Sequence, residues 1–392
     1  MITVAEALDR CLALTQPLET ETVPLRAACG RYMATAAVAK LTQPPFDASA
    51  MDGYALGAAG NNGARFTVIG EAGAGHGFDG TVEVNQAVRI FTGAPVPAGA
   101  VTVAIQEDVS VNGEEITLDA AVPDRANIRP RGQDFAAGDP LPPRLLRPND
   151  LALLAAMNVP QVCVTRRPIV GLIASGDELV MPGETPNADQ IIASNTFALA
   201  AMIETAGGET RMLPIARDTE ASLRAAFALA QDCDLIVTIG GASVGDHDLV
   251  GKVATDLGLE RAFWKIAMRP GKPLMAGRVL GKPMLGLPGN PVSAIVCAHL
   301  FLIPMLKSML GLPIAAPQTF SARLGCDLPA NGTRAHYMRA RLSNPEGILT
   351  ATPFDRQDSA LLSILTQADA LIILPPDCPQ QPMGTTIDYI QL

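Results

Sequence analysis

The sequence predicts a multidomain α/β protein. A doubly wound, mainly parallel α/β domain is accompanied by a β-rich insert, a discontinuous N-terminal α+β domain and a small C-terminal β-barrel-like domain. Three observations predict this fold class. The 392 residues exceed one ordinary core and favour two to four domains. From Pro168, short apolar runs alternate with helical stretches, as in a parallel sheet covered by helices. Gly- and Pro-rich segments with short β-runs lie on both sides of that region.

The N-terminal domain is assembled from two segments, residues 1–43 and 131–167. The first looks helical and then extended, and the second contains turns and a short helix that Asn149 or Asp150 would cap. Between the two segments the chain becomes Gly-rich with short β-runs. We therefore expect both segments to pack together as one discontinuous domain.

Residues 44–130 form the predicted β-rich insert. Its short β-runs lie at 66–69, 88–91 and 101–106. The segment Val109–Leu118 contains an Asn-Gly dipeptide at 112–113, which predicts a hairpin that turns there.

Residues 168–312 form the predicted α/β domain. Its strands are Ile169–Ala174, Met212–Ala216 and Leu235–Ile239, and Asp218 or Thr219 would cap the helix that follows the second strand. In such sheets ligands bind beyond the carboxyl ends of the strands, so the loops after these strands are where we expect a site.

The last predicted domain, residues 313–392, is a small β-domain. Five alternating or β-rich runs follow Leu312, with Gly and Pro breaks between them. They lie at 319–324, 336–342, 349–352, 370–374 and 386–392.

Composition excludes several classes of function. The net charge is −10, and aromatic residues make up 4% of the chain, with a single tryptophan, Trp264. A nucleic-acid binder needs a basic stripe or stacking surface, which this composition does not supply. The seven cysteines are scattered without a C-x-x-C pair and the four histidines are dispersed, so we expect free thiols in a reducing cytosol and no structural zinc.

The sequence also predicts a soluble, cytoplasmic protein with no membrane partner. The N-terminus does not resemble a signal peptide. The most apolar stretch, Val292–Ile303, is too short to span a bilayer and is interpreted as a core helix.

Three loops of the α/β domain combine small residues with carboxylates. They are Ser175–Glu178, Arg217-Asp218 and Gly240–Asp248. Glycine and serine let backbone N–H groups approach a phosphate closely. The carboxylates would repel a phosphate unless a hard cation such as Mg²⁺ bridges them. Alternatively, Asp177, Asp218 and Asp246 only start helices; both interpretations stay open.

A basic segment follows. Lys265, Arg269 and Lys272 place three cations within eight residues around a Pro-Gly turn. Such a cluster is typical of an oxyanion or phosphate cradle, and equally of a solvated turn. Pro291 begins the apolar helix and leaves free N–H groups, which bind an anion or merely follow the end of a strand.

Seven short motifs, in order along residues 49–291, resemble those of the molybdopterin molybdenumtransferase family, which includes the E domain of gephyrin. Each motif alone is weak, but seven in order are specific, and with the terminal β-domain the resemblance covers the whole chain. The motifs are Ser49–Ala55, Thr92–Pro97, Arg131–Asp134, Ser175–Leu179, Gly240–Gly245, Pro270–Pro273 and Leu287–Pro291.

The resemblance implies an elongated homodimer of four-domain subunits in which the N-terminal domain dimerises. It places the pocket between the α/β domain of one subunit and the β-insert of the other. The implied activity is insertion of molybdate into adenylylated molybdopterin, with Mg²⁺-dependent release of AMP, to give molybdenum cofactor. The molybdopterin adenylyltransferase and the downstream molybdoenzyme machinery are further candidate partners.

Site residues carry over motif by motif. The family's functional acids match Asp52, Asp134, Glu178, Asp218 and Asp248, of which Asp52, Asp218 and Asp248 are the candidate Mg²⁺ ligands. Substrate-binding positions match Thr92, Ser175, Gly240, Gly241, Ser243, Gly245, Lys265, Arg269, Lys272, Pro288 and Pro291. One departure is Arg269, which stands where relatives have lysine; its forked guanidinium would change oxyanion affinity.

Other classes of function predict different features. A scaffold role needs an exposed peptide-docking surface, which no segment marks. A stand-alone molybdopterin-adenylylating domain, or a nucleotide hydrolase built on it, needs only the α/β unit and would leave the β-insert and terminal β-domain without a purpose. Tungstate is close to molybdate in size and charge, so the preferred oxyanion stays open.

Overall fold

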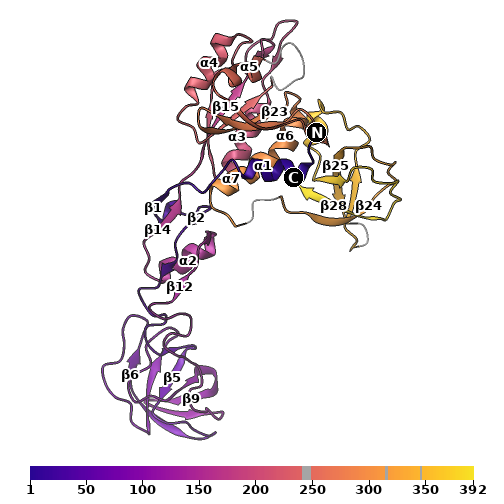
Figure 1. The fold of residues 1–392 in the computed structure, drawn as a ribbon. Coiled ribbons are helices and arrows are strands. Elements are labelled where there is room, and N and C mark those ends of the chain that lie inside the picture. Colours follow the sequence, from indigo (N-terminus) through magenta and orange to yellow (C-terminus); the bar gives the residue numbers. More distant parts are fainter. Residues whose placement is uncertain (241–248, 314–316, 345–346) are drawn as a thin grey trace. The chain divides into compact units, whose positions relative to one another are not determined.

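The computed structural model describes residues 1–240, 249–313, 317–344 and 347–392. The chain divides into two compact units (Figure 1). We call Met1–Glu21, Gly30–Ala34 and Thr165–Leu392 the first unit, and Thr22–Cys29 and Thr35–Val164 the second unit. This division does not test the four-domain boundaries, which stay a prediction.

The second unit is built on a six-stranded sheet in the order β8-β5-β7-β6-β10-β9. Its strands are β5 (Gly53–Leu56), β6 (Arg65–Ala72), β7 (Gln86–Ile90), β8 (Thr102–Ile105), β9 (Val109–Asn112) and β10 (Glu115–Leu118). Asn112 pairs with Glu115, so the hairpin turns at Gly113-Glu114, one residue later than predicted. Gly113 has a φ of 65°, which suits glycine at the first central position of a two-residue hairpin turn.

Short elements, some of which belong to the first unit, account for the remaining secondary structure between residues 20 and 165. They are β1 (Thr20–Pro24), η1 (Leu25–Ala27), β2 (Tyr32–Met33), β3 (Ala37–Val38), β4 (Ala48–Ser49), η2 (Gln106–Asp108), β11 (Ile128–Arg129), β12 (Pro140–Leu141), β13 (Arg144–Leu145), α2 (Pro148–Ala156) and β14 (Gln161–Thr165). The predicted cap of α2 is wrong: Arg147 is its N-cap. Asp150 lies in the first turn instead, where its carboxylate accepts the Arg147 N–H at 2.9 Å.

The first unit contains a six-stranded mixed sheet in the order β18-β15-β19-β23-β22-β20. Four strands run parallel: β15 (Ile169–Ala174), β18 (Glu209–Met212), β19 (Leu235–Ile239) and β23 (Lys282–Leu287). Antiparallel β22 (Met275–Val279) and β20 (Glu260–Trp264) complete it. The first and third predicted strands are confirmed; the second lies at Glu209–Met212 rather than 212–216.

Helices cover both faces of this sheet (Figure 1). One face carries α1 (Val4–Leu12), α3 (Asn195–Thr205) and the continuous run α6 (Pro291–Cys297), η3 (Ala298–Leu302) and α7 (Ile303–Met309). The other carries α4 (Glu220–Leu229) and α5 (Leu249–Asp256). Neighbouring strand residues alternate between the two cores: Leu172 packs in the first and Ile173 in the second.

The helix Pro291–Met309 is the one helix in the described ranges that could cross a membrane by length and composition. The helix has 19 residues and continues past Ile303. The prediction that this apolar stretch is too short to span a bilayer is therefore wrong. Within the fold, 72% of an 18-residue apolar stretch of this helix is buried. The interpretation as a core helix is confirmed.

The C-terminal strands close into a five-stranded ring in the order β24-β28-β27-β25-β26, with β26 pairing back to β24. The strands are β24 (Phe320–Leu324), β25 (Ala335–Ser343), β26 (Thr350–Pro353), β27 (Ala370–Leu374) and β28 (Thr386–Gln391). Smaller elements of the first unit are β16 (Leu179–Val180), β17 (Ile191–Ile192), β21 (Met268–Arg269) and α8 (Leu362–Leu365). With this ring, the predicted fold class is confirmed.

One ion pair fixes the start of the parallel sheet. The guanidinium of Arg166 donates two hydrogen bonds to Asp234, at 2.6 and 2.7 Å, and Asp234 also accepts the Ile169 N–H at 2.8 Å. Burial raises the pKa of Asp234, but the hydrogen bonds from Arg166 and Ile169 and the charge of Arg166 outweigh it, so the pKa lies below its usual range. The pair therefore joins the chain before β15 to the chain before β19.

We predict that Asp234→Asn lowers the free energy of unfolding of the first unit by about 1–2 kcal/mol, because the partly exposed Arg166 guanidinium loses its bidentate carboxylate and keeps the exposed Glu19 at 2.9 Å. Urea titrations followed by Trp264 fluorescence measure this. A lowered carboxyl pKa gives stability that is present above the unfolded pKa and is lost as pH falls through the folded pKa. The difference between the two proteins should therefore shrink below about pH 4. Exposed Asp232→Asn is the control, and equal stability of both variants at pH 7 would contradict the prediction.

Candidate functional site

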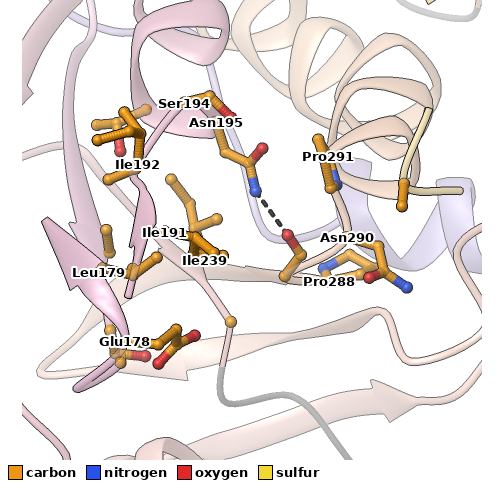
Figure 2. A pocket seen from close by; sticks show the side chains of 18 of the residues that line it. Glu178, Leu179, Ile191, Ile192, Ser194, Asn195, Ile239, Pro288, Asn290 and Pro291 are labelled. Carbon is orange, nitrogen blue, oxygen red and sulfur yellow. Dashed lines mark hydrogen bonds between the residues drawn. The ribbon is translucent and has the colours of Figure 1, made fainter. Parts of the chain in front are cut away.

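A cavity of about 680 Å³ opens at the carboxyl ends of β15, β19 and β23 in the first unit (Figure 2). Parallel strands bring their carboxyl ends to one edge of the sheet, where ligands bind in this class of fold. Six predicted site residues line it: Ser175, Glu178, Asp218, Gly240, Pro288 and Pro291. Gly176, from the same loop as Ser175, lines it as well. We call this space the strand-end cavity.

Two acidic loops of this cavity hold each other in place. The Asp218 N–H donates to the Asp177 carboxylate at 3.1 Å, and the Asp177 N–H donates to the Asp218 carboxylate at 3.4 Å. Neither side chain caps a helix, since the N-cap of α4 is Thr219, whose hydroxyl accepts the Ser222 N–H. The capping alternative is therefore wrong for Asp177 and Asp218. Asp246 lies outside the described residues.

Glycine is required at two positions of the rim. Gly176 has a φ of 149°, and a Cβ there would lie 2.2 Å from the Glu178 carboxylate. Gly240 has a φ of 87°, and a Cβ there would lie 3.1 Å from the Ser175 carbonyl oxygen. These glycines let the chain turn sharply and keep both strand ends open.

Asn195 is a lining residue that the sequence reasoning missed. Its amide nitrogen donates to the Gly289 carbonyl at 2.7 Å, which joins the start of α3 to the loop before α6 (Figure 2). Its carbonyl oxygen is buried and has no hydrogen-bond partner in the described part of the chain. The signal that could have found it is a polar residue at the start of an otherwise apolar helix.

A second cavity of about 350 Å³ adjoins the first, because Pro273 and Asn290 line both. Arg269, Lys272 and Arg334 contribute three cationic side chains, and Asp358 contributes one acid. We call this space the cationic cavity. Arg334 was missed by sequence reasoning because it comes from the C-terminal ring, 62 positions beyond Lys272 in the chain.

A loop of the C-terminal ring closes one side of the cationic cavity. Ser359 accepts the Asn290 amide through its hydroxyl at 3.1 Å and the Val292 N–H through its carbonyl at 3.1 Å. The second bond satisfies one of the free N–H groups at the start of α6. Buried Arg339 holds the loop by donating to the Leu361 carbonyl and to the Gln357 side chain.

Arg269 and Lys265 lie in different surroundings. Arg269 lines the cationic cavity and hydrogen-bonds to the buried His336 ring at 2.7 Å. Lys265 is absent from the linings of both cavities, and its ammonium lies 4.1 Å from the centroid of the Trp264 ring. The structure thus brings together two of the three predicted cations.

The second unit carries a separate group of predicted residues around Asp52. The Asp52 carboxylate accepts two hydrogen bonds from Thr92, from the N–H at 2.7 Å and the hydroxyl at 2.8 Å. The Thr92 N–H is the main cause that lowers the Asp52 pKa, followed by the Thr92 hydroxyl and then the charge of Arg89. Asp52 is therefore held ionised.

Asp47, which sequence reasoning missed, gathers three motifs in the second unit. Its carboxylate accepts from the Arg131 N–H at 2.8 Å and the Arg125 guanidinium at 3.2 Å, and its carbonyl accepts the Val96 N–H. Asp134 lies on the same Arg131 loop and is exposed, and its N–H donates to the Gln43 carbonyl. Segments up to 84 positions apart in the chain are thereby joined around Asp47.

Four predicted site residues, Gly241, Ser243, Gly245 and Asp248, lie outside the described residues. Within the described ranges, no group of three or more His, Cys, Asp and Glu side chains is arranged to hold a metal ion. Glu178 and Asp218 both line the strand-end cavity and offer hard oxygen ligands. The first unit thus combines an acidic space beside small-residue loops with an adjoining cationic space.

Family models match most of the chain. Residues 2–158 match the MoeA N-terminal region (domain I and II), residues 171–308 match a probable molybdopterin binding domain, and residues 321–392 match the MoeA C-terminal region (domain IV).

Curated relatives and solved structures are similar over nearly the full length. The chain is 33% identical to the molybdopterin molybdenumtransferase of Haemophilus influenzae, over 99% of this chain and 98% of that one. It is 34% identical to molybdopterin molybdenumtransferase 2 of Mycobacterium tuberculosis, over 99% and 97%. Its fold matches the crystal structure of a molybdopterin biosynthesis MoeA protein from Pyrococcus horikosii with a TM-score of 0.84 and 30% identity, over 100% and 99% of the two chains.

We predict that Thr92→Val raises the pKa of the Asp52 carboxyl, because one of its two hydrogen-bond donors is removed while the N–H remains. Carbon-13 NMR titration of the aspartate carboxyl groups measures the shift. Thr92→Ser restores a hydroxyl and should return the pKa towards the wild-type value. An unchanged Asp52 titration in Thr92→Val would show that the side-chain hydrogen bond does not act on this carboxyl.

Proposed function

Because this chain belongs to the molybdopterin molybdenumtransferase family of molybdenum cofactor biosynthesis, we propose that it inserts molybdate into adenylylated molybdopterin and releases AMP in a Mg²⁺-dependent reaction. The observation that carries the proposal is the pair of adjoining cavities in the first unit. One offers small-residue loops and carboxylates, and the other offers cations. A substrate that carries a phosphate and has to receive an oxyanion needs both kinds of cavity.

The strand-end cavity suits the pterin and its adenylylated phosphate. The Ser175 hydroxyl can donate to a phosphate oxygen, and Gly240 has no side chain to keep the phosphate at a distance. The N–H groups of both residues already donate to the Ile239 and Leu287 carbonyls. Ile191, Ile192 and the prolines at 288 and 291 offer an apolar wall for a ring system. Asn195 adds a buried acceptor for a ring N–H group.

The donor set fits Mg²⁺. This ion usually takes one or two carboxylates and completes its octahedron with water and substrate phosphates. Asp218 supplies such a carboxylate beside the strand-end cavity, and Asp52 and Asp248 are the other proposed ligands. Bound there, Mg²⁺ would neutralise charge on the phosphoric anhydride.

The protein's own groups would do the remaining work. Arg269, Lys272 and Arg334 would hold molybdate, a dianion, in the cationic cavity. Glu178, exposed on the strand-end rim, and Asp134 would orient water or accept protons as the anhydride is cleaved. The dithiolene sulfurs that ligate molybdenum belong to the substrate, so the protein supplies position and charge.

We also propose a cytoplasmic homodimer in which the Asp52 group of one chain and the strand-end cavity of the other act on the same substrate. The family resemblance supports this arrangement, and it gives Asp52, Thr92 and Asp134 a role although the second unit carries them. The molybdopterin adenylyltransferase is the proposed supplier of substrate, and molybdoenzyme machinery the proposed recipient. Tungstate remains a possible substrate by size and charge.

We predict that wild-type protein releases AMP from adenylylated molybdopterin only when both molybdate and Mg²⁺ are present. Asp52→Ala and Asp218→Ala should each lower the rate at least about 100-fold, since each removes a carboxylate from the charge balance of the anhydride. Chromatographic quantification of AMP measures the rate.

Exposed aspartates in the same units are matched controls. Asp79→Ala in the second unit and Asp256→Ala in the first should keep the wild-type rate. The catalytic proposal fails if wild-type protein cleaves no adenylylated molybdopterin with either molybdate or tungstate.

Mixing the two inactive variants tests the shared site. If each site uses Asp52 of one chain and Asp218 of the other, a mixed dimer of Asp52→Ala and Asp218→Ala chains contains one intact site. After exchange of equal amounts, activity should return to about a quarter of wild type. No recovery, with mixed dimers demonstrated by mass spectrometry, would place both residues in a site within one chain.

A further inference from the structure

Arg269 and His336 are direct partners between the α/β part of the first unit and the C-terminal ring. Strand β21 pairs in parallel with β25, and Arg269 stands opposite His336 in that register. The guanidinium of Arg269 lies 2.7 Å from Nδ1 of His336. In the described part of the chain this is the only hydrogen bond of that guanidinium.

The direction of this hydrogen bond fixes the charge of the histidine. A guanidinium only donates, so Nδ1 must accept and the ring proton sits on Nε2. His336 is 3% exposed. Burial is the main cause that lowers its pKa to about 4, and the charges of Arg269, Arg339 and Arg334 lower it further. The ring is therefore neutral at neutral pH.

A neutral acceptor has a different effect from a carboxylate. An aspartate opposite Arg269 would orient the guanidinium but also cancel its charge. The imidazole orients it and leaves the charge intact for a ligand. The one carboxylate that lines the cationic cavity, Asp358, accepts the Ala360 N–H at 2.8 Å within its own loop.

We propose that His336 is a positioning residue that aims the Arg269 guanidinium into the cationic cavity and, being uncharged, keeps its full charge available to molybdate. The inference deepens the proposed function and depends on molybdate binding in that cavity. Arg269 is exposed and lines the cavity, so its remaining N–H groups can donate hydrogen bonds to two oxygens of a tetrahedral oxyanion. The arginine at this position thus works because its strand partner is a buried histidine.

Three substitutions of His336 separate the contributions of its hydrogen-bond acceptor, its ring volume and its lack of charge. His336→Asn keeps a neutral acceptor near the position of Nδ1. His336→Phe keeps the ring volume without an acceptor. His336→Asp keeps an acceptor but adds a negative charge. Equilibrium dialysis of the full chain with molybdate alone gives the affinity, and AMP release gives the Michaelis constant for molybdate separately from kcat.

We predict that His336→Phe and His336→Asp each weaken molybdate binding about 10-fold, through lost orientation and lost charge respectively. His336→Asn should stay within about 3-fold of wild type. In the Phe and Asp variants, the Michaelis constant for molybdate should rise while kcat with saturating molybdate stays near the wild-type value, since adenylylated molybdopterin is held elsewhere. Wild-type affinity in the Asp and Phe variants would overturn the inference.

A double-mutant cycle tests that His336 acts through Arg269. In an Arg269→Gln background, His336→Phe should cause no further loss of molybdate affinity, because the group that it positions is gone. An additive loss would show that His336 supports the fold in general and would overturn the positioning role. Thermal unfolding followed by Trp264 fluorescence verifies that each variant is folded.

Different outcomes overturn the proposed function and the positioning role of His336. If wild-type protein releases AMP with molybdate but Arg269→Gln leaves molybdate affinity unchanged, the inference about the pair is overturned and the proposed function stands. If wild-type protein neither binds molybdate nor releases AMP, the proposed function fails and the inference fails with it.

Discussion

The parallel register of β15, β18, β19 and β23 is the constraint on which the candidate site depends. Strands that run in one direction deliver their following loops to one edge of the sheet, so residues 175, 218, 240 and 288 meet although more than a hundred positions separate the outermost. Apolar packing on both faces makes that register costly to shift, because a slip of one residue would exchange Leu172 and Ile173 between the two cores. The rim can therefore be built from small residues that pack little themselves.

The start of α6 joins this sheet to the C-terminal ring. Pro291 begins the helix without an N–H of its own, and the following Val292 N–H is satisfied by the Ser359 carbonyl of the ring. Asn290, directly before α6, lines both cavities, as does Pro273 before β22. Two parts of the chain that look independent in sequence thereby contribute to two adjoining cavities.

Much of the fold and part of the site could be predicted from sequence because their signals are local. Ile169–Ala174 and Leu235–Ile239 are continuous apolar runs bounded by turns, so both strands were found to the residue. The strand at Glu209–Met212 was misplaced because it is an edge strand of the sheet and three of its four residues are polar, so it lacks a continuous apolar run. Asn195, Asp47 and Arg334 were missed for another reason. Their importance comes from contacts with distant segments, such as Asn195 with Gly289, that no local pattern encodes.

The separation of charge explains how an acidic chain can serve an anionic substrate. With a net charge of −10, the protein repels anions at long range, so affinity must come from short-range contacts where cations converge. Arg269 and Lys272 do so beside a cavity in which Asp358 is the only acid among the described lining residues, and its carboxylate accepts the Ala360 N–H of its own loop. The carboxylates that line the strand-end cavity, Glu178 and Asp218, would be unfavourable beside an oxyanion and useful beside a divalent cation. Pro273 and Asn290 line both cavities, so the two sets of charges lie close together without sharing one cavity.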